Sequence, residues 1–342
     1  MSGTAGYRML LAGLALATAV LFALSLTVGP AGISLSDSLD ALVFGNGGAA
    51  GHDADTRAAM VLVMREIRLP RALLGLGIGA SLGLSGAVLQ GLLRNPLAEP
   101  GLLGVSASAS LGAVLAIYTG LSALFPLALP LAALAGAVAA VIVVQAMAQG
   151  GGTLTIILAG VAVTSFAAAM TSLALNLSPN PFAALEIVFW MLGSLDDRSM
   201  THVWLAGPFI LAGCAMLARC GRALDALTLG HDAARSLGID LARVRLFAIL
   251  GTASAVGAAT AVAGAIGFVG LVVPHLMRPL VGAVPSRLLP ASALGGAAMV
   301  LAADIAVRVI APGRDLKLGV LTAIVGAPFF LWLVYRSRRE PA

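Results

Sequence analysis

The chain has 342 residues, of which 60% are hydrophobic and only 10% are charged. A typical soluble domain has roughly a quarter of its residues charged, so this composition excludes an ordinary soluble protein and indicates an integral membrane protein. The formal net charge of +5 does not indicate nucleic-acid binding, because the basic residues are spread thinly through the polar connecting segments. Membrane proteins carry such residues as topological anchors.

Apolar runs predict an all-α, polytopic bundle of about ten membrane-spanning helices, since about 20 residues cross the hydrocarbon core. The first run is longer than the apolar region of a signal peptide, so we expect a retained helix there. A short surface helix is expected between the fifth and sixth spans. The predicted spans are 9–29, 69–92, 101–120, 124–148, 154–177, 203–220, 246–264, 266–282, 289–311 and 318–335.

Ten spans place both chain termini on one side of the membrane. With the N-terminus inside, 12 basic residues lie on the cytoplasmic side and 8 on the outer side, which agrees with the positive-inside rule. Four arginines near the start of the second span go against this bias, and such an exception suggests another role. They are Arg57, Arg65, Arg68 and Arg71.

Small residues recur at every fourth position in two of the spans. Residues 75, 79 and 83 are glycines, and residues 251, 255, 259 and 263 are glycine or alanine. Faces of this kind let helix backbones approach closely in a membrane, so we expect tight helix–helix contacts there.

A polar and broken segment, LLRNPLAEPGLLG, separates the second and third spans at residues 92–104. Pro96 and Pro100 lack a backbone N–H and bias the preceding residues away from the helical conformation. Because irregular backbone at membrane depth needs protein or water around it, we expect this segment to be buried in protein or to lie at the cytoplasmic face. An ordinary turn between two helices is the alternative.

Four stretches, in order and with matching spacing, resemble the FecCD family. These are the permeases of bacterial ABC importers for iron–siderophore complexes, haem and vitamin B12. The stretches are 68–106, 228–245, 263–282 and 301–336, and they contain the motif residues Asn95, Pro96, Pro100, Gly267, Gly270, Pro274, His275 and Asp304.

The resemblance implies a bundle like the vitamin B12 permease, a type II ABC importer. The chain is then a single permease domain over 1–342, with the helical bundle at 9–336. It also implies a homodimer with a central passage, two copies of a separate ATPase, a periplasmic substrate-binding protein and no cofactor in this chain. The expected location is the bacterial inner membrane, with both termini cytoplasmic.

The energy source lies outside this chain, whether in a partner or in an ion gradient. A Walker A motif ends in Gly-Lys-Ser/Thr, and the single lysine, Lys317, is followed by Leu318. The resemblance implies that ATP is used by the separate ATPase, which would make this chain a transport subunit and not an enzyme.

The polar stretch 221–245 contains a predicted short helix that begins near Asp232 and ends at Gly238. The resemblance implies that this cytoplasmic coupling segment docks into a cleft of the ATPase, and an ordinary surface helix is the alternative. The residues expected to couple are His231, Asp232, Ala233, Ala234, Arg235, Ser236, Leu237 and Gly238.

Arg68 and Arg71 are three residues apart, so one helical turn places them on one face. Asp304 lies one turn before Arg308 and can fix it by an i,i+4 pair. The resemblance implies that the three arginines pair with glutamates of the binding protein at the outer face. Snorkelling of the side chains to the membrane interface is the alternative.

Gln90 and Asn176 are polar residues within spans, so they either line the passage or join helices by hydrogen bonds. Thr153 is the gate candidate, because the turn 149–153 resembles the cytoplasmic gate region of the family. His275 is expected to be structural and not a haem ligand. No metal site is expected, because Cys214 and Cys220 have no histidine partner nearby.

The predicted function is therefore the permease of an ABC importer for an iron chelate, with iron–siderophore as the commonest cargo of the family. Haem and vitamin B12 are alternative cargoes. A secondary transporter would need carboxylates near the middle of the membrane, and Asp304 lies near a span end beside an arginine. A membrane enzyme would need clustered polar residues, but the four histidines are scattered.

Overall fold

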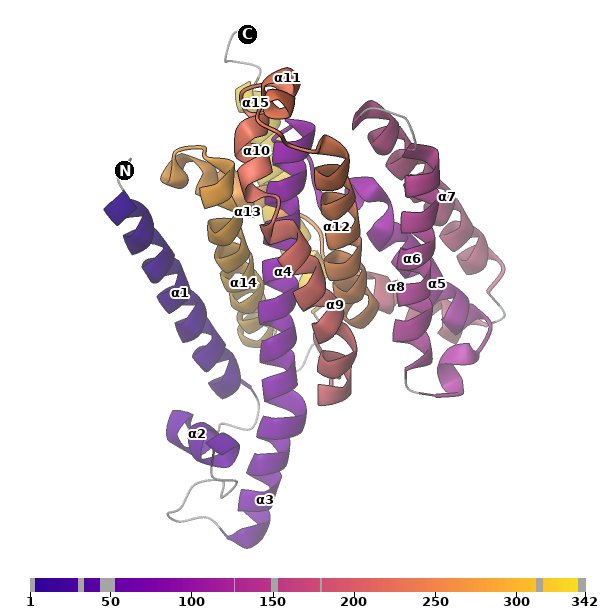
Figure 1. The fold of residues 1–342 in the computed structure, drawn as a ribbon. Helices are drawn as coiled ribbons and strands as arrows, with labels where there is room; N and C mark the ends of the chain where they lie inside the picture. The colour runs from indigo at the N-terminus through magenta and orange to yellow at the C-terminus, as the bar shows by residue number, and fades with distance from the viewer. Residues whose placement is uncertain are drawn as a thin grey trace.

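The computed structural model describes residues 4–29, 34–43, 53–125, 127–148, 153–178, 180–311 and 316–337. Within these ranges all regular structure is helical, and ten of the helices correspond to the ten predicted spans (Figure 1). The prediction of an all-α membrane bundle is therefore confirmed. The ten helices are α1 (Thr4–Thr27), α4 (Leu69–Leu93), α5 (Val105–Tyr118), α6 (Ala128–Ala148), α7 (Thr153–Asn176), α9 (Met200–Ala218), α12 (Leu241–Ala263), α13 (Val269–Val281), α14 (Pro285–Ile310) and α15 (Leu318–Ser337).

Shorter helices connect or flank the spans. The predicted surface helix is α8 (Pro181–Met191), and the polar stretch after α9 holds α10 (Gly221–Leu227) and α11 (His231–Ser236). Two outer helices, α2 (Leu35–Val43) and α3 (Ala54–Leu62), were not predicted. A π-helical turn over Val63–Arg68 joins α3 to α4 into one continuous helix of 40 residues. The α3 end of this helix projects beyond the bundle (Figure 1).

Seven helices of the described chain are long and apolar enough to cross a membrane, and α5, α13 and α15 are shorter apolar helices. The predicted starts of α5 and α13, at 101 and 266, were too early. A 3₁₀ turn over Pro100–Leu103 precedes α5, and the chain between Gly264 and Phe268 is irregular before α13. Both helices therefore begin only after broken backbone.

The two broken segments meet inside the bundle. Arg94 ends α4 in the left-handed conformation, with φ of 48°, and the Asn95 side chain accepts a hydrogen bond from the Leu97 backbone N–H at 2.9 Å. Pro100 is buried against Gly270 at the start of α13, where an added Cβ would lie 2.6 Å from the proline Cδ. Part of the polar segment is thus buried in protein. This was one of the two locations expected for it, the other being the cytoplasmic face.

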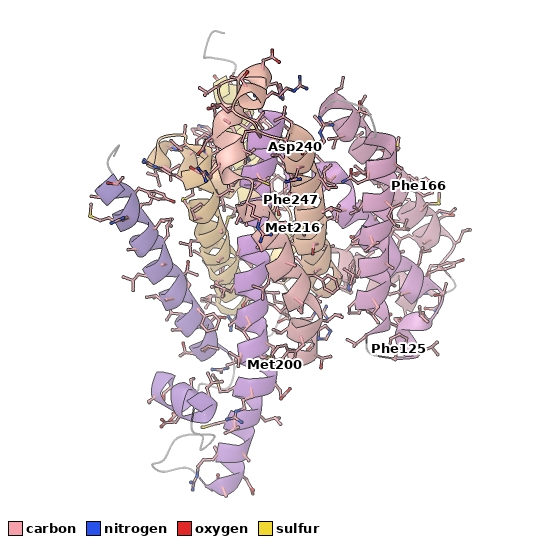
Figure 2. All side chains as sticks on the ribbon, in the orientation of Figure 1. Phe125, Phe166, Met200, Met216, Asp240 and Phe247 are labelled. Atoms are coloured by element: carbon pink, nitrogen blue, oxygen red, sulfur yellow. The ribbon has the colours of Figure 1, made fainter. Side chains whose placement is uncertain are left out.

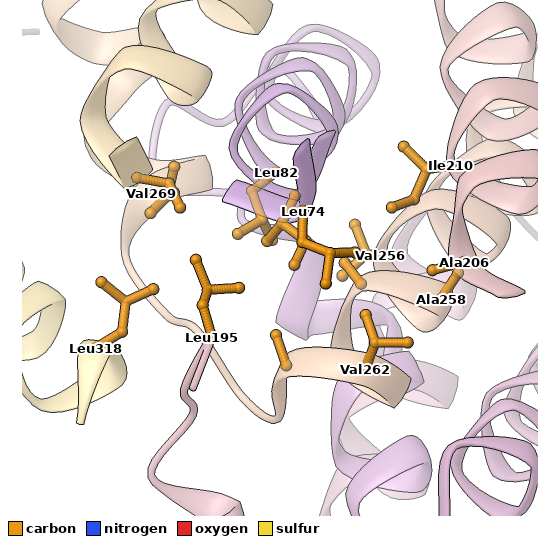
Figure 3. Packing of buried hydrophobic residues seen from close by; sticks show 14 of the residues in the cluster. Leu74, Leu82, Leu195, Ala206, Ile210, Val256, Ala258, Val262, Val269 and Leu318 are labelled. Carbon is orange, nitrogen blue, oxygen red and sulfur yellow. The ribbon is translucent and has the colours of Figure 1, made fainter. Parts of the chain in front are cut away.

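Close backbone contact through small residues joins the central helices, as the four-residue spacing predicts. A Cβ added at Gly83 of α4 would lie 2.0 Å from the Ser292 carbonyl oxygen of α14, and one at Gly213 of α9 would lie 2.5 Å from the Gly251 oxygen of α12. Around these contacts, Leu74 of α4 packs with apolar side chains of α12 and α13 (Figure 3).

We predict that Gly83→Ala strongly destabilises the protein, because the new methyl group has no room unless α4 and α14 separate. Gly77→Ala on the same helix is the matched control, since its nearest neighbour, a methyl carbon of Ile210, is 3.7 Å away. Thermal unfolding in detergent measures both variants. Equal melting temperatures would contradict the close contact of α4 with α14.

Candidate functional site

Different helices lie at the two ends of the bundle. The start of α1, the end of α15 and the helices α10 and α11 lie at one end, while α2 and α3 lie at the other (Figure 1). This arrangement agrees with ten spans. We name the end with α11 the inner end and the end with α3 the outer end. The cytoplasmic location of the inner end stays a prediction.

A buried ionic cluster lies at the outer end, and we name it the arginine cluster: Arg68, Arg71, Asp196, Asp304 and Arg308. Asp304 is at its centre, because Arg71 Nη2 lies 2.8 Å from Asp304 Oδ1 and Arg308 Nη2 lies 2.8 Å from Asp304 Oδ2. Arg71 Nε also donates to Asp304 Oδ1 at 2.9 Å, and Arg71 Nη1 donates to Asp196 Oδ1. The cluster therefore ties α4, α14 and the α8–α9 loop together.

Two of these arginines, Arg68 and Arg308, donate hydrogen bonds to carbonyl groups at the end of α1. Arg308 Nη1 donates to the Ser25 and Val28 carbonyl oxygens at 2.9 and 2.6 Å. Arg68 Nη1 donates to the Leu26 and Thr27 carbonyl oxygens at 2.7 and 3.0 Å. The last carbonyl groups of a helix have no partner within it, and cations near that end are favoured by the helix dipole.

The members of the arginine cluster differ in how far they are exposed to solvent. Arg68 is 4% exposed, and the side chains of Arg71, Arg308 and Asp304 are 12%, 11% and 2% exposed. The Asp196 side chain is 33% exposed. The structure thus brings the three predicted docking arginines together and finds the expected Asp304–Arg308 pair. Docking of a binding protein on these arginines stays a prediction.

The loop that carries Asp196, residues 192–199, links the cluster to two other helices. The Ser194 backbone N–H donates to the Ala263 carbonyl oxygen at the end of α12 at 2.7 Å. The Gly319 N–H of α15 donates to the Gly193 oxygen at 3.2 Å. In the same loop, burial lowers the pKa of the Arg198 guanidinium, and the charges of Asp197 and Asp196 oppose that shift.

A groove of about 590 Å³ with a partly polar lining runs between α5 and α7. We name it the hydroxyl groove. Glu99 lies in its wall, at the end of the broken segment, and Met191 and Ala265 close another side. Six hydroxyl side chains line it: Ser106, Ser110, Thr164, Ser165, Thr171 and Ser172.

Sequence reasoning missed this groove, and its signal was the helical spacing of hydroxyl residues in two apolar spans. Ser106 and Ser110 are four residues apart, and Thr164 and Thr171 are seven apart, so each pair shares a helix face. Glu99 was missed because it lies outside the predicted spans, whereas the structure folds its segment back against α7. A Cβ at Gly160 of α7 would meet the Leu102 oxygen at 1.9 Å.

The predicted passage residues lie elsewhere. Gln90 is 2% exposed, its Nε2 donates to the Gly270 and Leu271 carbonyl oxygens at 3.4 Å, and its Oε1 accepts from Arg278 at 2.7 Å. Gln90 therefore joins α4 to the first turn of α13 by hydrogen bonds, which is one of the two roles expected of it. Asn176 is exposed at the end of α7, outside the groove lining, and the Thr153 side chain lies outside the described residues.

His275 packs among aromatic side chains. Its ring centroid lies 5.7 Å from that of Phe329 in an edge-on arrangement, at a cavity of about 790 Å³ that Asn95, Pro96 and Arg278 also line. The structural role expected of it stays a prediction. Among the described residues, no three histidine, cysteine, aspartate or glutamate side chains lie close enough together to hold a metal ion.

The predicted helix in the polar stretch is confirmed as α11. Gly230 and Gly238, with φ of 116° and 78°, bound it, and Ala234 is fully buried against the bundle. Asp232 and Arg235 point outward, with side chains 101% and 70% exposed. Leu229 and Leu237, which flank α11, are also exposed, at 70% and 64%, so this segment presents two large apolar side chains at the inner end. The coupling role of this segment stays a prediction.

A family model described as the FecCD transport family matches residues 12–336. The chain belongs to this family. It is 40% identical to the ferric enterobactin permease protein FepD of Escherichia coli over 100% of both chains. It is also 40% identical to the Fe(3+) dicitrate permease protein FecD of Escherichia coli, over 81% of this chain and 86% of that protein.

The fold agrees with this membership. A solved structure described as an inward-facing conformation of a metal-chelate type ABC transporter superposes with a TM-score of 0.82 and 31% identity. The match covers 96% of this chain and 99% of that chain. This FecCD chain is therefore a multi-pass permease of the ABC-importer kind. Its family consists of permease subunits, which are not enzymes.

We predict that Asp304→Asn destabilises the permease by about 3–5 kcal/mol, because it leaves two buried guanidinium groups without their shared carboxylate. Asp240→Asn is the matched control at the exposed start of α12 (Figure 2), where asparagine caps a helix as well as aspartate does. Thermal unfolding of both purified variants measures the difference. A melting temperature for Asp304→Asn equal to that of the control would contradict a central role of this carboxylate.

Proposed function

We propose that this chain is the permease of a bacterial inner-membrane ABC importer whose cargo is an iron chelate, with an iron–siderophore complex first among the candidates. The match to FepD over the full length of both chains carries this proposal. Haem and vitamin B12 are the alternative cargoes, since a hemin permease protein of Yersinia pestis and vitamin B12 permease proteins of Salmonella are 36% and 40% identical to this chain.

The hydroxyl groove is the proposed wall of the passage. A carboxylate in contact with lipid hydrocarbon is unfavourable, so the Glu99 side of the groove faces water or protein. Two copies of the single permease domain, facing each other, would enclose such a space. Hydroxyl groups offer hydrogen bonds that any large chelate can exchange, which suits a passage and not a tight binding site.

The driving force is proposed to come from two copies of a separate ATPase at the inner end. The chain has no Walker A lysine, and the exposed Leu229 and Leu237 flank α11 beside the exposed Asp232 and Arg235. Exposed apolar side chains ringed by charges are typical of a protein–protein contact. A substrate-binding protein is proposed to dock at the outer end, over the arginine cluster.

We predict that the permease, reconstituted in liposomes with its ATPase and binding protein, takes up an iron chelate only when ATP is supplied. Ala168→Trp should abolish uptake, because the indole fills the hydroxyl groove, yet leave the stimulation of ATP hydrolysis by the binding protein intact. Ala169→Trp is the control, since Ala169 is exposed but does not line the groove. The uptake of radioactive iron is measured for wild type, Ala168→Trp and Ala169→Trp.

Uptake driven by a proton or sodium gradient without ATP would instead favour the secondary transporter. Loss of uptake in both tryptophan variants would contradict the assignment of the passage to this groove.

We predict that replacing residues 232–237 with a Gly/Ser linker abolishes copurification with the ATPase, because it removes both the helix and Leu237 from the contact. The control is Asp240→Asn, just beyond α11, which should leave the complex intact. Copurification is measured by affinity capture of the ATPase. A stable, transport-competent complex with the linker variant would show that the ATPase docks elsewhere.

A further inference from the structure

The proposed docking of a binding protein meets a difficulty in the arginine cluster: Arg68 is buried, Arg71 and Arg308 are only slightly exposed, and all three are bonded within the chain. Arg68 and Arg308 donate to carbonyl oxygens at the end of α1, and Arg308 also pairs with Asp304. Only one acidic group of the cluster reaches solvent to any extent, because the Asp196 side chain is 33% exposed and that of Asp304 only 2%.

We propose that Arg71 is a carboxylate-binding site for the docked binding protein and that Asp196 occupies this site in the free permease. The incoming carboxylate replaces Asp196 on Arg71 Nη1, while Asp304 stays bound to the other side of the guanidinium. This inference rests on the proposed docking function and specifies how one arginine of the cluster takes part in it.

The bonding pattern decides which carboxylate leaves. Asp304 accepts hydrogen bonds from Arg71 Nε and also pairs with Arg71 Nη2 and Arg308 Nη2, so its removal would break the link between α4 and α14 as well as a pair within α14. Asp196 contacts Arg71 only through Nη1, and its second oxygen accepts from the Ser194 hydroxyl of its own loop at 3.0 Å. Asp196 is therefore the carboxylate that can be exchanged without opening the bundle.

Exchange also avoids the main electrostatic cost of docking. Leaving a buried arginine without a partner is strongly unfavourable, but one carboxylate replacing another keeps Arg71 paired throughout. Arg198, in the same loop, is the proposed new partner of the released Asp196. Arg198 Nε is buried and makes no hydrogen bond among the described residues, and the charge of Asp196 already acts on that guanidinium.

The loop that would be released leads from the outer surface to the passage wall. Its residues Gly193 and Ser194 are bonded to the start of α15 and the end of α12. Met191, just before the loop, and Ala265, just after α12, line the hydroxyl groove. Replacement of Asp196 therefore loosens a link between the arginine cluster and this groove, so that docking at the surface reaches the passage.

The test compares Asp196→Asn with Asp197→Asn in the permease–ATPase complex embedded in lipid nanodiscs. The probe is the fluorescently labelled substrate-binding protein of the system, and its Kd is measured by titration. A neutral amide competes less well for a guanidinium than a carboxylate does, so Asp196→Asn should bind about tenfold tighter than wild type. Asp197→Asn should match wild type, because Asp197 makes no ion pair among the described residues.

A second variant protects the test against a failure of Asp196→Asn to fold. Ser194→Ala removes the hydroxyl that holds Asp196 in place and should tighten binding by about threefold. A Kd within twofold of wild type for both variants, or equal tightening by Asp197→Asn, would overturn the exchange. If wild type binds and is stimulated by the binding protein while the variants do not differ from it, the docking function stands and only the exchange fails.

Discussion

Irregular backbone inside a membrane has to find its hydrogen bonds within the protein, and this constraint shapes the whole bundle. The broken segment before α5 meets the start of α13 where Pro100 packs on Gly270, and Gln90 bonds the Gly270 and Leu271 carbonyl groups in the same turn. That meeting requires α4, α13 and α14 to approach within backbone contact, which glycine residues allow. The tight centre of the bundle and its two short helices are thus parts of one arrangement.

Charged side chains at membrane depth also have to find partners within the protein, and leaving them unpaired costs more free energy than leaving a backbone group unpaired. Asp304 is buried because two arginines share it, and those arginines also satisfy the carbonyl groups at the end of α1. Polarity elsewhere is handled by the hydroxyl groove, where uncharged groups and one carboxylate gather on a wall that lipid would not tolerate. The permease thereby keeps its ionic contacts at the outer end apart from the surface along which we propose that cargo moves.

Individual residues show where sequence reasoning succeeded and where it failed. The proline break, the glycine spacing of α4 and the helix at α11 were predicted because each depends on local backbone chemistry. The role of Gln90 was left open because a polar residue within a span can either line a passage or bond a neighbouring helix, and only its neighbours in the fold decide. The length of α3 and α4 was missed because the segment before Arg68 is too polar to read as part of a span, although it continues the helix.

The sequence by itself determined the class of protein, the number of spans, the positions of the breaks and the family, because apolar length, proline and glycine chemistry and four long motifs are local properties. Only the tertiary structure decided which groups meet. Asp196 reaches Arg71 from 125 residues away and Asp304 reaches it from 233 away. Glu99 joins hydroxyl groups on two other helices. Such contacts depend on how the helices pack, and no spacing along the chain records that.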